Sequence, residues 1–240
     1  MFTRIYNYLL HILFPRCCVC CHVDLAWDNP VPLCPACAAL LKEPGPLICA
    51  RCGRVLPSGG AHCFACRGRK GETYKCKVIR SAFVFNEPVR CLVHALKYRQ
   101  AQYLARYMGE QMVRRWENIP ELAGVNYVVP VPLFKKRYRR RGFNQSESLA
   151  QALARQLSLP LDTSCLQRIR DTSSQTKLGR IQRMQNMQGA FACSDNGKVK
   201  GKIVLLVDDV CTTGATLEAC AVALRAAGAK RVMAFTYARE

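Results

Sequence analysis

The sequence has no long hydrophobic run. None of its apolar segments approaches the roughly 18 to 20 residues that a membrane-spanning helix needs, so we expect no integral membrane span. The short apolar run at 9–14 is followed by no small-residue cleavage site, unlike a secretory signal peptide. We expect an amphipathic helix, ended by Pro15, that packs on the protein itself, with peripheral membrane contact as the alternative. The expected location is the cytoplasm, including the inner face of the membrane.

Acidic residues are scarce. The chain has 16 aspartates and glutamates against 36 lysines and arginines, a formal net charge of +20. This excess favours an anionic partner such as nucleic acid, a phosphate compound or a lipid surface. The densest basic stretch is KKRYRRR at 135–141. Such a run can bind phosphates, and its tyrosine can stack on a base. A solvated loop is the alternative, but the run directly follows the expected strand 127–133, which favours binding of pyrophosphate, DNA or both. The candidate nucleic-acid contacts are Lys135, Lys136, Arg137, Tyr138, Arg139 and Arg140.

Cysteine is present in excess. The chain has 16 cysteines, concentrated in its first third. In a reducing cytosol, paired cysteines indicate metal rather than disulfides. Four C-x-x-C pairs are separated by 12, 11 and 10 residues, and each pair places two thiolates at a spacing that tetrahedral zinc accepts. The pattern predicts two structural zinc sites in tandem ribbons, one with Cys18, Cys21, Cys34 and Cys37 and the other with Cys49, Cys52, Cys63 and Cys66.

The details of this zinc module stay open in the sequence. The stretch CCVCC also allows a first pair one residue earlier, Cys17 and Cys20, and the two sites could be cross-braced instead of sequential. His22 and His62 lie beside ligands and could substitute for them, although surface positions are the simpler interpretation. The module is too small to bury a core alone, so we expect metal to fold it and its role to be structural.

The rest of the chain has the pattern of an α/β domain. Segments with the composition of strands occur at 78–86, 127–133, 203–207 and 231–237. Apolar residues recur with helical spacing at 87–99, 101–117, 144–159, 176–189 and 216–227. This alternation predicts a parallel sheet with helices on both faces. The domains are expected at 1–67 for the N-terminal helix and zinc module, 68–77 for a linker, and 78–240 for the α/β domain.

Two acids and a hydroxyl-rich loop follow the expected strand 203–207. Asp208 and Asp209 come first, and the loop contains Gly214. Ligands of such sheets bind at the carboxyl ends of the strands. Backbone N–H groups of a turn that enters a helix form an anion site, whereas carboxylates accept hydrogen bonds from sugar hydroxyls or help to hold a divalent cation. A receiver domain also places acids at strand ends, but the Thr-Thr-Gly loop favours a ribose 5-phosphate site.

The segment VLLVDDVCTTGAT at 204–216 resembles the phosphoribosyl-pyrophosphate motif of type I phosphoribosyltransferases. Nearly the whole chain resembles the ComF/ComFC competence-protein family, including GntX-like members, through the cysteine pairs, this motif and the segments LKY at 96–98, VPVPL at 129–133, RRGFNQ at 140–145 and QTKLGRIQRMQNMQGAF at 175–191. The resemblance implies a type I phosphoribosyltransferase-like parallel sheet flanked by helices and preceded by a small Cys-rich double zinc ribbon. It also favours Cys18 and Cys21 as the first pair, because Leu25 then follows at the family's spacing.

The resemblance also implies roles for individual residues. Asp208 and Asp209 would contact the ribose hydroxyls of Mg²⁺-bound phosphoribosyl pyrophosphate. The loop around its 5-phosphate would comprise Thr212, Thr213, Gly214, Ala215 and Thr216. Its pyrophosphate would lie at Pro130, Val131 and Pro132, near Arg140, Arg141 and Gly142. Gln175, Arg183 and Asn186 would belong to a mobile catalytic loop. The candidate catalytic residues are Asp208, Asp209, Arg141, Gln175 and Arg183, and Lys97, Tyr98 and Arg99 could face the same site.

Three functions fit these features. The chain could be a phosphoribosyltransferase with an unknown acceptor, acting in natural transformation on incoming single-stranded DNA in the cytoplasm. It could be a non-catalytic DNA-binding scaffold that keeps the phosphoribosyl site as a sensor or relic. It could also dock a transformation helicase through its zinc ribbons. Glu240 comes directly after the last expected strand, so we expect no C-terminal hood for a base and no conventional purine or pyrimidine salvage.

Overall fold

The computed structural model describes residues 11, 15–67, 74–98, 102–172, 180–194 and 196–240. The expected N-terminal helix and most of the expected linker lie outside these residues. No helix of the described part of the chain is long and apolar enough to cross a membrane. The division into a zinc module and an α/β domain stays a prediction.

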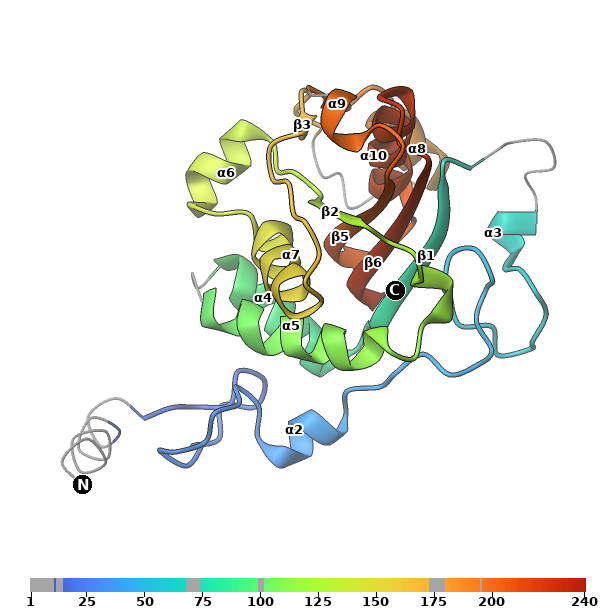
Figure 1. Cartoon of the computed structure of the whole chain (residues 1–240). Helices are drawn as coiled ribbons and strands as arrows, with labels where there is room; N and C mark the ends of the chain where they lie inside the picture. Colours follow the sequence, from blue (N-terminus) through green and yellow to red (C-terminus); the bar gives the residue numbers. More distant parts are fainter. Residues whose placement is uncertain (1–10, 12–14, 68–73, 99–101, 173–179, 195) are drawn as a thin grey trace.

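A four-stranded parallel sheet forms the centre of the molecule (Figure 1). Its strand order is β1-β6-β5-β2. The strands are β1 (Cys76–Val84), β2 (Tyr127–Pro130), β5 (Ile203–Cys211) and β6 (Arg231–Arg239). A separate antiparallel pair consists of β3 (Leu166–Arg168) and β4 (Phe191–Cys193). The sheet confirms the predicted α/β class.

Helices cover both faces of the sheet because its central strands are apolar on both sides. Along β5, Leu205 and Val207 pack into one hydrophobic cluster, and Val204 and Leu206 pack into the other. The first cluster includes residues of α4 (Glu87–Tyr98), α5 (Gln102–Trp116) and α7 (Gln145–Gln156). The second includes residues of α8 (Arg180–Met187) and α10 (Ala215–Ala226). Figure 1 shows these two groups of helices on opposite sides of the sheet.

Two elements differ from the sequence-based expectation. The basic run 135–141 is not a loop but helix α6 (Lys135–Arg141), which ends at Gly142 in the left-handed conformation. Strand β5 continues through both aspartates to Cys211, so the acids lie within the last part of the strand rather than after it. The remaining short elements are α2 (Pro35–Ala39), α3 (Phe64–Arg67), the 3-10 turn η1 (Pro120–Leu122) and α9 (Asn196–Val199).

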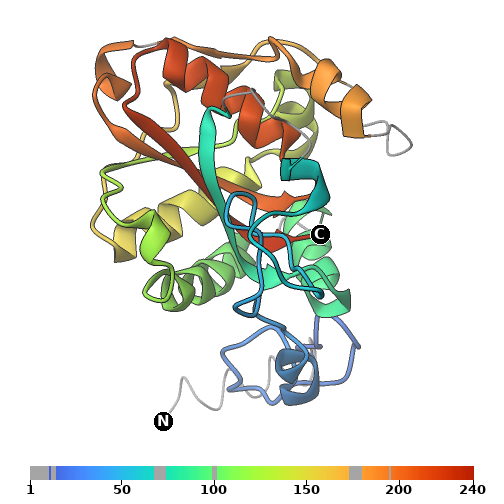
Figure 2. The ribbon, with the colours of Figure 1, turned by 90° about the vertical axis from the view of Figure 1, so that its right-hand side faces the viewer.

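The two cysteine-rich segments contact different parts of the α/β domain. In the first, Leu25 and Leu33 join the hydrophobic cluster that also contains Leu92 of α4. The second lies beside β1, where the Ile79 N–H donates to the Arg51 carbonyl over 2.8 Å. Figure 2 shows the first segment below the sheet domain and the second against the sheet edge. Each segment therefore uses the domain to complete its packing.

Candidate functional site

The carboxyl ends of β5 and β2 meet at one edge of the sheet. Pro130 of β2 is aligned with Val207 of β5, and the Val131 N–H donates to the Val207 carbonyl over 2.9 Å. The predicted pyrophosphate segment therefore lies directly beside Asp208. The two parts of the predicted site are more than 70 residues apart in sequence, and the parallel pairing of their strands brings them together.

The amino-terminal end of α7 holds the acid pair in place. Asn144 caps this helix by accepting from the Ser146 N–H over 3.1 Å, and its amide donates to the Val131 carbonyl over 3.1 Å. Ser146 Oγ donates to Asp208 Oδ1 over 2.7 Å. Gln145 Nε2 donates to Asp209 Oδ2 over 3.2 Å. One helix terminus thus fixes the pyrophosphate segment and both aspartates.

The two aspartates differ in how many hydrogen bonds their carboxylate oxygens already accept from the described residues. Asp209 is 5% exposed, and its oxygens accept from the Val210 N–H, Gln145 and Lys97, whose Nζ is 2.6 Å away. Asp208 uses Oδ1 for both of its hydrogen bonds, from Ser146 and from the Asp209 N–H. Its Oδ2 has no hydrogen bond with another described residue. Asp208 can therefore accept a bond from a ligand directly, whereas Asp209 would exchange a partner.

Burial and the adjacent Asp209 charge raise the pKa of Asp208 to about 7, against the lowering effects of the Ser146 and Asp209 hydrogen bonds and the Lys97 charge. Its protonated form is consequently favoured far more than in an exposed aspartate. A carboxyl with a pKa near neutrality, next to an open ligand position, is typical of functional sites.

The loop after β5 forms the amino-terminal entrance of α10. Gly214 has a φ of +80°, which is the left-handed region, and no side chain caps the helix. Thr213 Oγ1 accepts from the Ala215 N–H over 3.3 Å. Thr212, Thr213, Gly214 and Thr216 are half-buried and Ala215 is buried. Uncapped backbone N–H groups at the start of a 12-residue helix suit an anionic group.

Helix α6 carries six basic side chains and contacts this site through one of them. Lys135, Lys136, Arg139 and Arg140 are exposed. The other two arginines point to protein groups, since Arg137 Nη2 donates to the Thr172 carbonyl over 3.0 Å and Arg141 Nη1 donates to Gln145 Oε1. Burial lowers the pKa of Arg141, opposed by the charge of Asp209. Arg141 is therefore the α6 residue that reaches the acid pair, through Gln145.

Part of the predicted catalytic loop lies outside the described residues. Gln175 belongs to that part, and the side chain of Arg183 is not described. The Asn186 carbonyl accepts from Arg170 Nη2 over 3.4 Å, which places the end of α8 beside the β3 segment. The contacts of Gln145 and Ser146 with the aspartates were not predicted. The RRGFNQ segment, which ends at Gln145, was the available signal.

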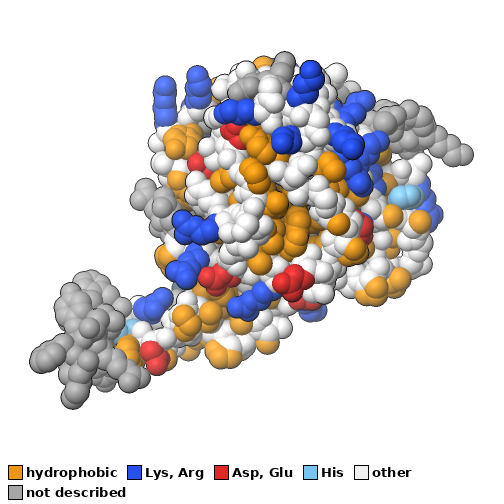
Figure 3. All heavy atoms as spheres, viewed as in Figure 1, with side chains coloured by type: hydrophobic (Ala, Val, Ile, Leu, Met, Phe, Trp, Pro, Cys, Tyr) orange, Lys and Arg blue, Asp and Glu red, His pale blue; other side chains and the backbone are white. Residues whose placement is uncertain are grey.

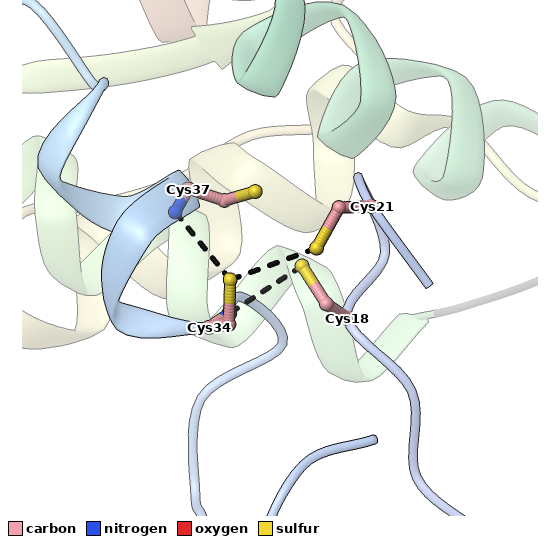
Figure 4. A group of neighbouring side chains, drawn as sticks. All are labelled: Cys18, Cys21, Cys34 and Cys37. Atoms are coloured by element: carbon pink, nitrogen blue, oxygen red, sulfur yellow. Dashed lines mark hydrogen bonds between the residues drawn. The ribbon is translucent and has the colours of Figure 1, made fainter. Parts of the chain in front are cut away.

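Two groups of four cysteines have their sulfur atoms within 4.8 Å of one another: Cys18, Cys21, Cys34 and Cys37, and Cys49, Cys52, Cys63 and Cys66. Figure 4 shows the first four side chains converging. The Cys21–Cys34 and Cys52–Cys63 sulfur distances are 3.7 and 3.6 Å. Tetrahedral zinc with bonds of about 2.3 Å would give sulfur separations of about 3.8 Å. The donor set and its spacing therefore fit structural zinc.

The same geometry resolves the alternatives left open by the sequence. Pairing is sequential, and the first pair is Cys18 with Cys21. Cys17 lies outside the group, exposed, with its thiol directed to Asp24 Oδ1 over 3.4 Å. Neither His22 nor His62 belongs to the four-cysteine groups, although His62 Nδ1 lies 3.9 Å from the Cys49 sulfur.

Comparisons with known proteins agree with this geometry. Residues 144–239 match the family model described as phosphoribosyl transferase domain. The chain is 32% identical over 233 residues to DNA utilization protein YhgH from Salmonella typhi, covering 94% of this chain and 97% of that protein. Identity is 30% over 195 residues to competence protein F from Haemophilus influenzae, with 80% and 84% covered. Identity is also 30% over 214 residues to competence protein ComFC from Bacillus subtilis, with 87% and 84% covered. The chain therefore belongs to the competence protein F family and contains a phosphoribosyltransferase domain.

Proposed function

We propose that this protein binds phosphoribosyl pyrophosphate together with Mg²⁺ at the carboxyl ends of β5 and β2. The observation that carries the proposal is the pair Asp208 and Asp209, held by α7, directly before an uncapped helix entrance at Gly214. The free Oδ2 of Asp208 is suited to a ribose hydroxyl, and the residues at 212–216 are suited to the 5-phosphate. The pyrophosphate would lie at Pro130, Val131 and Pro132, next to Arg141.

Mg²⁺ would enter this site with the pyrophosphate and offset its negative charge. The open carboxylate oxygen of Asp208 is a hard donor of the kind that Mg²⁺ accepts, either directly or through water. Zinc would occupy both four-cysteine sites and hold the amino-terminal segments in their fold. Lys97 would hold the Asp209 carboxylate in place through its ion pair, and Arg141 would supply positive charge to the leaving group.

We further propose that the protein handles single-stranded DNA in the cytoplasm. The relatives are named for competence and DNA utilization, and four exposed cations lie on α6, the helix whose Arg141 is linked to Asp209 through Gln145. Cations in such a row bind a nucleic-acid backbone through counterion release. A helicase that moves the DNA would be the protein partner. The alternative of a non-catalytic scaffold predicts the same binding without turnover.

Calorimetric titration with phosphoribosyl pyrophosphate and Mg²⁺ tests the site. Asp208→Asn and Asp209→Asn should each weaken binding by roughly 10- to 150-fold, because a hydrogen bond to a charged group contributes about 1.5–3 kcal/mol. Asp28→Asn is the matched control, since it makes the same change at an exposed position of the cysteine-rich segment. Unchanged affinity in both site variants would show that the ligand binds elsewhere.

Turnover is measured in the same samples by the release of pyrophosphate with and without single-stranded DNA. Release that depends on DNA would identify an enzyme whose acceptor is linked to DNA. Tight binding without release under either condition would favour the scaffold.

A further inference from the structure

Tyr98 exposes an aromatic ring beside the phosphoribosyl site. It is the last residue of α4, and its side chain is 60% exposed. The preceding residue, Lys97, places its Nζ 2.6 Å from Asp209 Oδ2. The ring therefore belongs to the residue that directly follows the Lys97–Asp209 ion pair on α4. Solvent exposure of a large ring at such a position leaves apolar surface that a ligand can cover.

The ring is supported by two neighbours. His94, one turn earlier on α4, lies with its ring centroid 4.7 Å from that of Tyr98 at an interplanar angle of 38°. The Arg141 guanidinium lies 5.6 Å from the Tyr98 centroid and also bonds to Gln145, which holds Asp209. Tyr98 thus lies beside the arginine at the end of α6 that is linked to Asp209 through Gln145, and the His94 ring lies against it.

Two other tyrosines with exposed rings differ in their surroundings. Tyr103, on α5, is 61% exposed but adjoins the first cysteine-rich segment at Arg16 and Cys17. Tyr138, on α6, is 48% exposed and has exposed cations around it, but in the described part of the chain no hydrogen bond or ring contact joins it to the aspartates. Figure 3 shows lysine and arginine side chains projecting from the end of the molecule where α6 lies. Among these three rings, Tyr98 combines exposure with a link to both α6 and the ribose site.

We propose that Tyr98 is a stacking platform for one base of single-stranded DNA, with the neighbouring phosphates on the exposed cations of α6. The proposal rests on the DNA handling proposed above and assigns it a position. An aromatic ring within a basic surface binds unpaired bases without sequence preference, because every base has a flat apolar face. The arrangement would deliver the stacked base to the edge of the site that Lys97 and Asp209 form.

The test measures the Kd of a fluorescent oligothymidylate over a series of salt concentrations. Tyr98→Ala should raise the Kd by roughly 5- to 100-fold and leave the salt slope unchanged, because stacking releases no counterions. Tyr98→Phe keeps a ring and should bind like the wild type. Tyr103→Ala is the matched control, with equal exposure and no expected effect. Arg139→Gln with Arg140→Gln should instead reduce the salt slope by about 1.4.

A wild-type Kd in Tyr98→Ala would overturn the proposal, as would an equal loss in Tyr103→Ala. A loss confined to Tyr138→Ala would place the stacked base on α6 instead. Titration with phosphoribosyl pyrophosphate in each variant separates this result from the phosphoribosyl site itself. If the wild type binds that compound but no oligonucleotide, the DNA function and the platform both fail, and the phosphoribosyl site stands. The unfolding midpoint of Tyr98→Phe and Tyr98→Ala controls for folding.

Discussion

At the residue scale, the Asp208 carboxyl makes stability depend on pH. Burial and the Asp209 charge raise its pKa from 3.8 to about 7. The folded state therefore binds the Asp208 proton more tightly than the unfolded state does. The stabilisation that this proton gives is fully present below the unfolded pKa and is lost as the pH rises toward 7. The asparagine of the Asp208→Asn variant cannot ionise. The free energy of unfolding of the variant, minus that of the wild type, should therefore increase by about 1–3 kcal/mol between about pH 5 and 7 and then level off. Denaturant unfolding of both proteins across this range measures the difference, and a constant difference would contradict the raised pKa.

The sequence singled out Asp208 and Asp209 and named Lys97 as a residue that could face the same site, but it did not point to Ser146 and Gln145 as the groups that hold the acids. A buried-looking strand followed by two acids is a local pattern, and a glycine in a hydroxyl-rich loop is another. Ser146 and Gln145 contact the acids across 62 and 64 residues of sequence, and Lys97 comes from an earlier helix. Such contacts depend on how α4 and α7 pack on the sheet. Only the family resemblance, through LKY and RRGFNQ, pointed to those segments.

At the element scale, the turn from β5 into α10 requires glycine. A Cβ at Gly214 would lie 3.3 Å from Ile79 Cδ1, and its φ of +80° costs other residues about 1–2 kcal/mol. Gly214→Ala should lower stability by at least that amount and weaken binding of phosphoribosyl pyrophosphate. Gly201→Ala is the control, because its φ is +73° and a Cβ there would meet no atom within 4 Å. It should lower stability but leave binding unchanged, as unfolding and calorimetric titration can establish. Equal binding in the two variants would contradict the role of the turn.

Element boundaries were less predictable where polar residues have partners. Strand β5 continues past Val207 because Ser146 and Lys97 satisfy carboxylates that would otherwise end a buried strand. Helix α6 was treated as a loop because its charges dominate the pattern, although Gly142 is a common signal for the end of a helix. Strands β3 and β4 have three residues each, too few for an alternating pattern to be recognised.

At the scale of the whole molecule, cysteine spacing predicted the ligand groups but not where they dock. The second group is connected to the end of β5 and the start of α10 through arginines. Arg51, between Cys49 and Cys52, pairs with Glu218 in the first turn of α10 over 2.9 Å. Arg239 is 3% exposed, directs Nη1 to the Cys211 sulfur, and helps to lower the pKa of Cys52, after the larger effect of the Cys66 hydrogen bond. The second four-cysteine group and the turn from β5 into α10 therefore share supporting residues.

This connection predicts different effects of losing each metal. Cys63→Ser should remove one metal ion and release the segment that carries Arg51. Binding of phosphoribosyl pyrophosphate should then weaken, because Glu218 in the first turn of α10 loses its ion pair with Arg51. Cys34→Ser should also remove one metal ion, but the first group packs on α4 and α5, away from the phosphate loop, so binding should persist. Metal analysis and calorimetric titration on both variants make the comparison. Equal loss of affinity would show that the amino-terminal segments act together as one support, and that the arginines around the second group have no separate role.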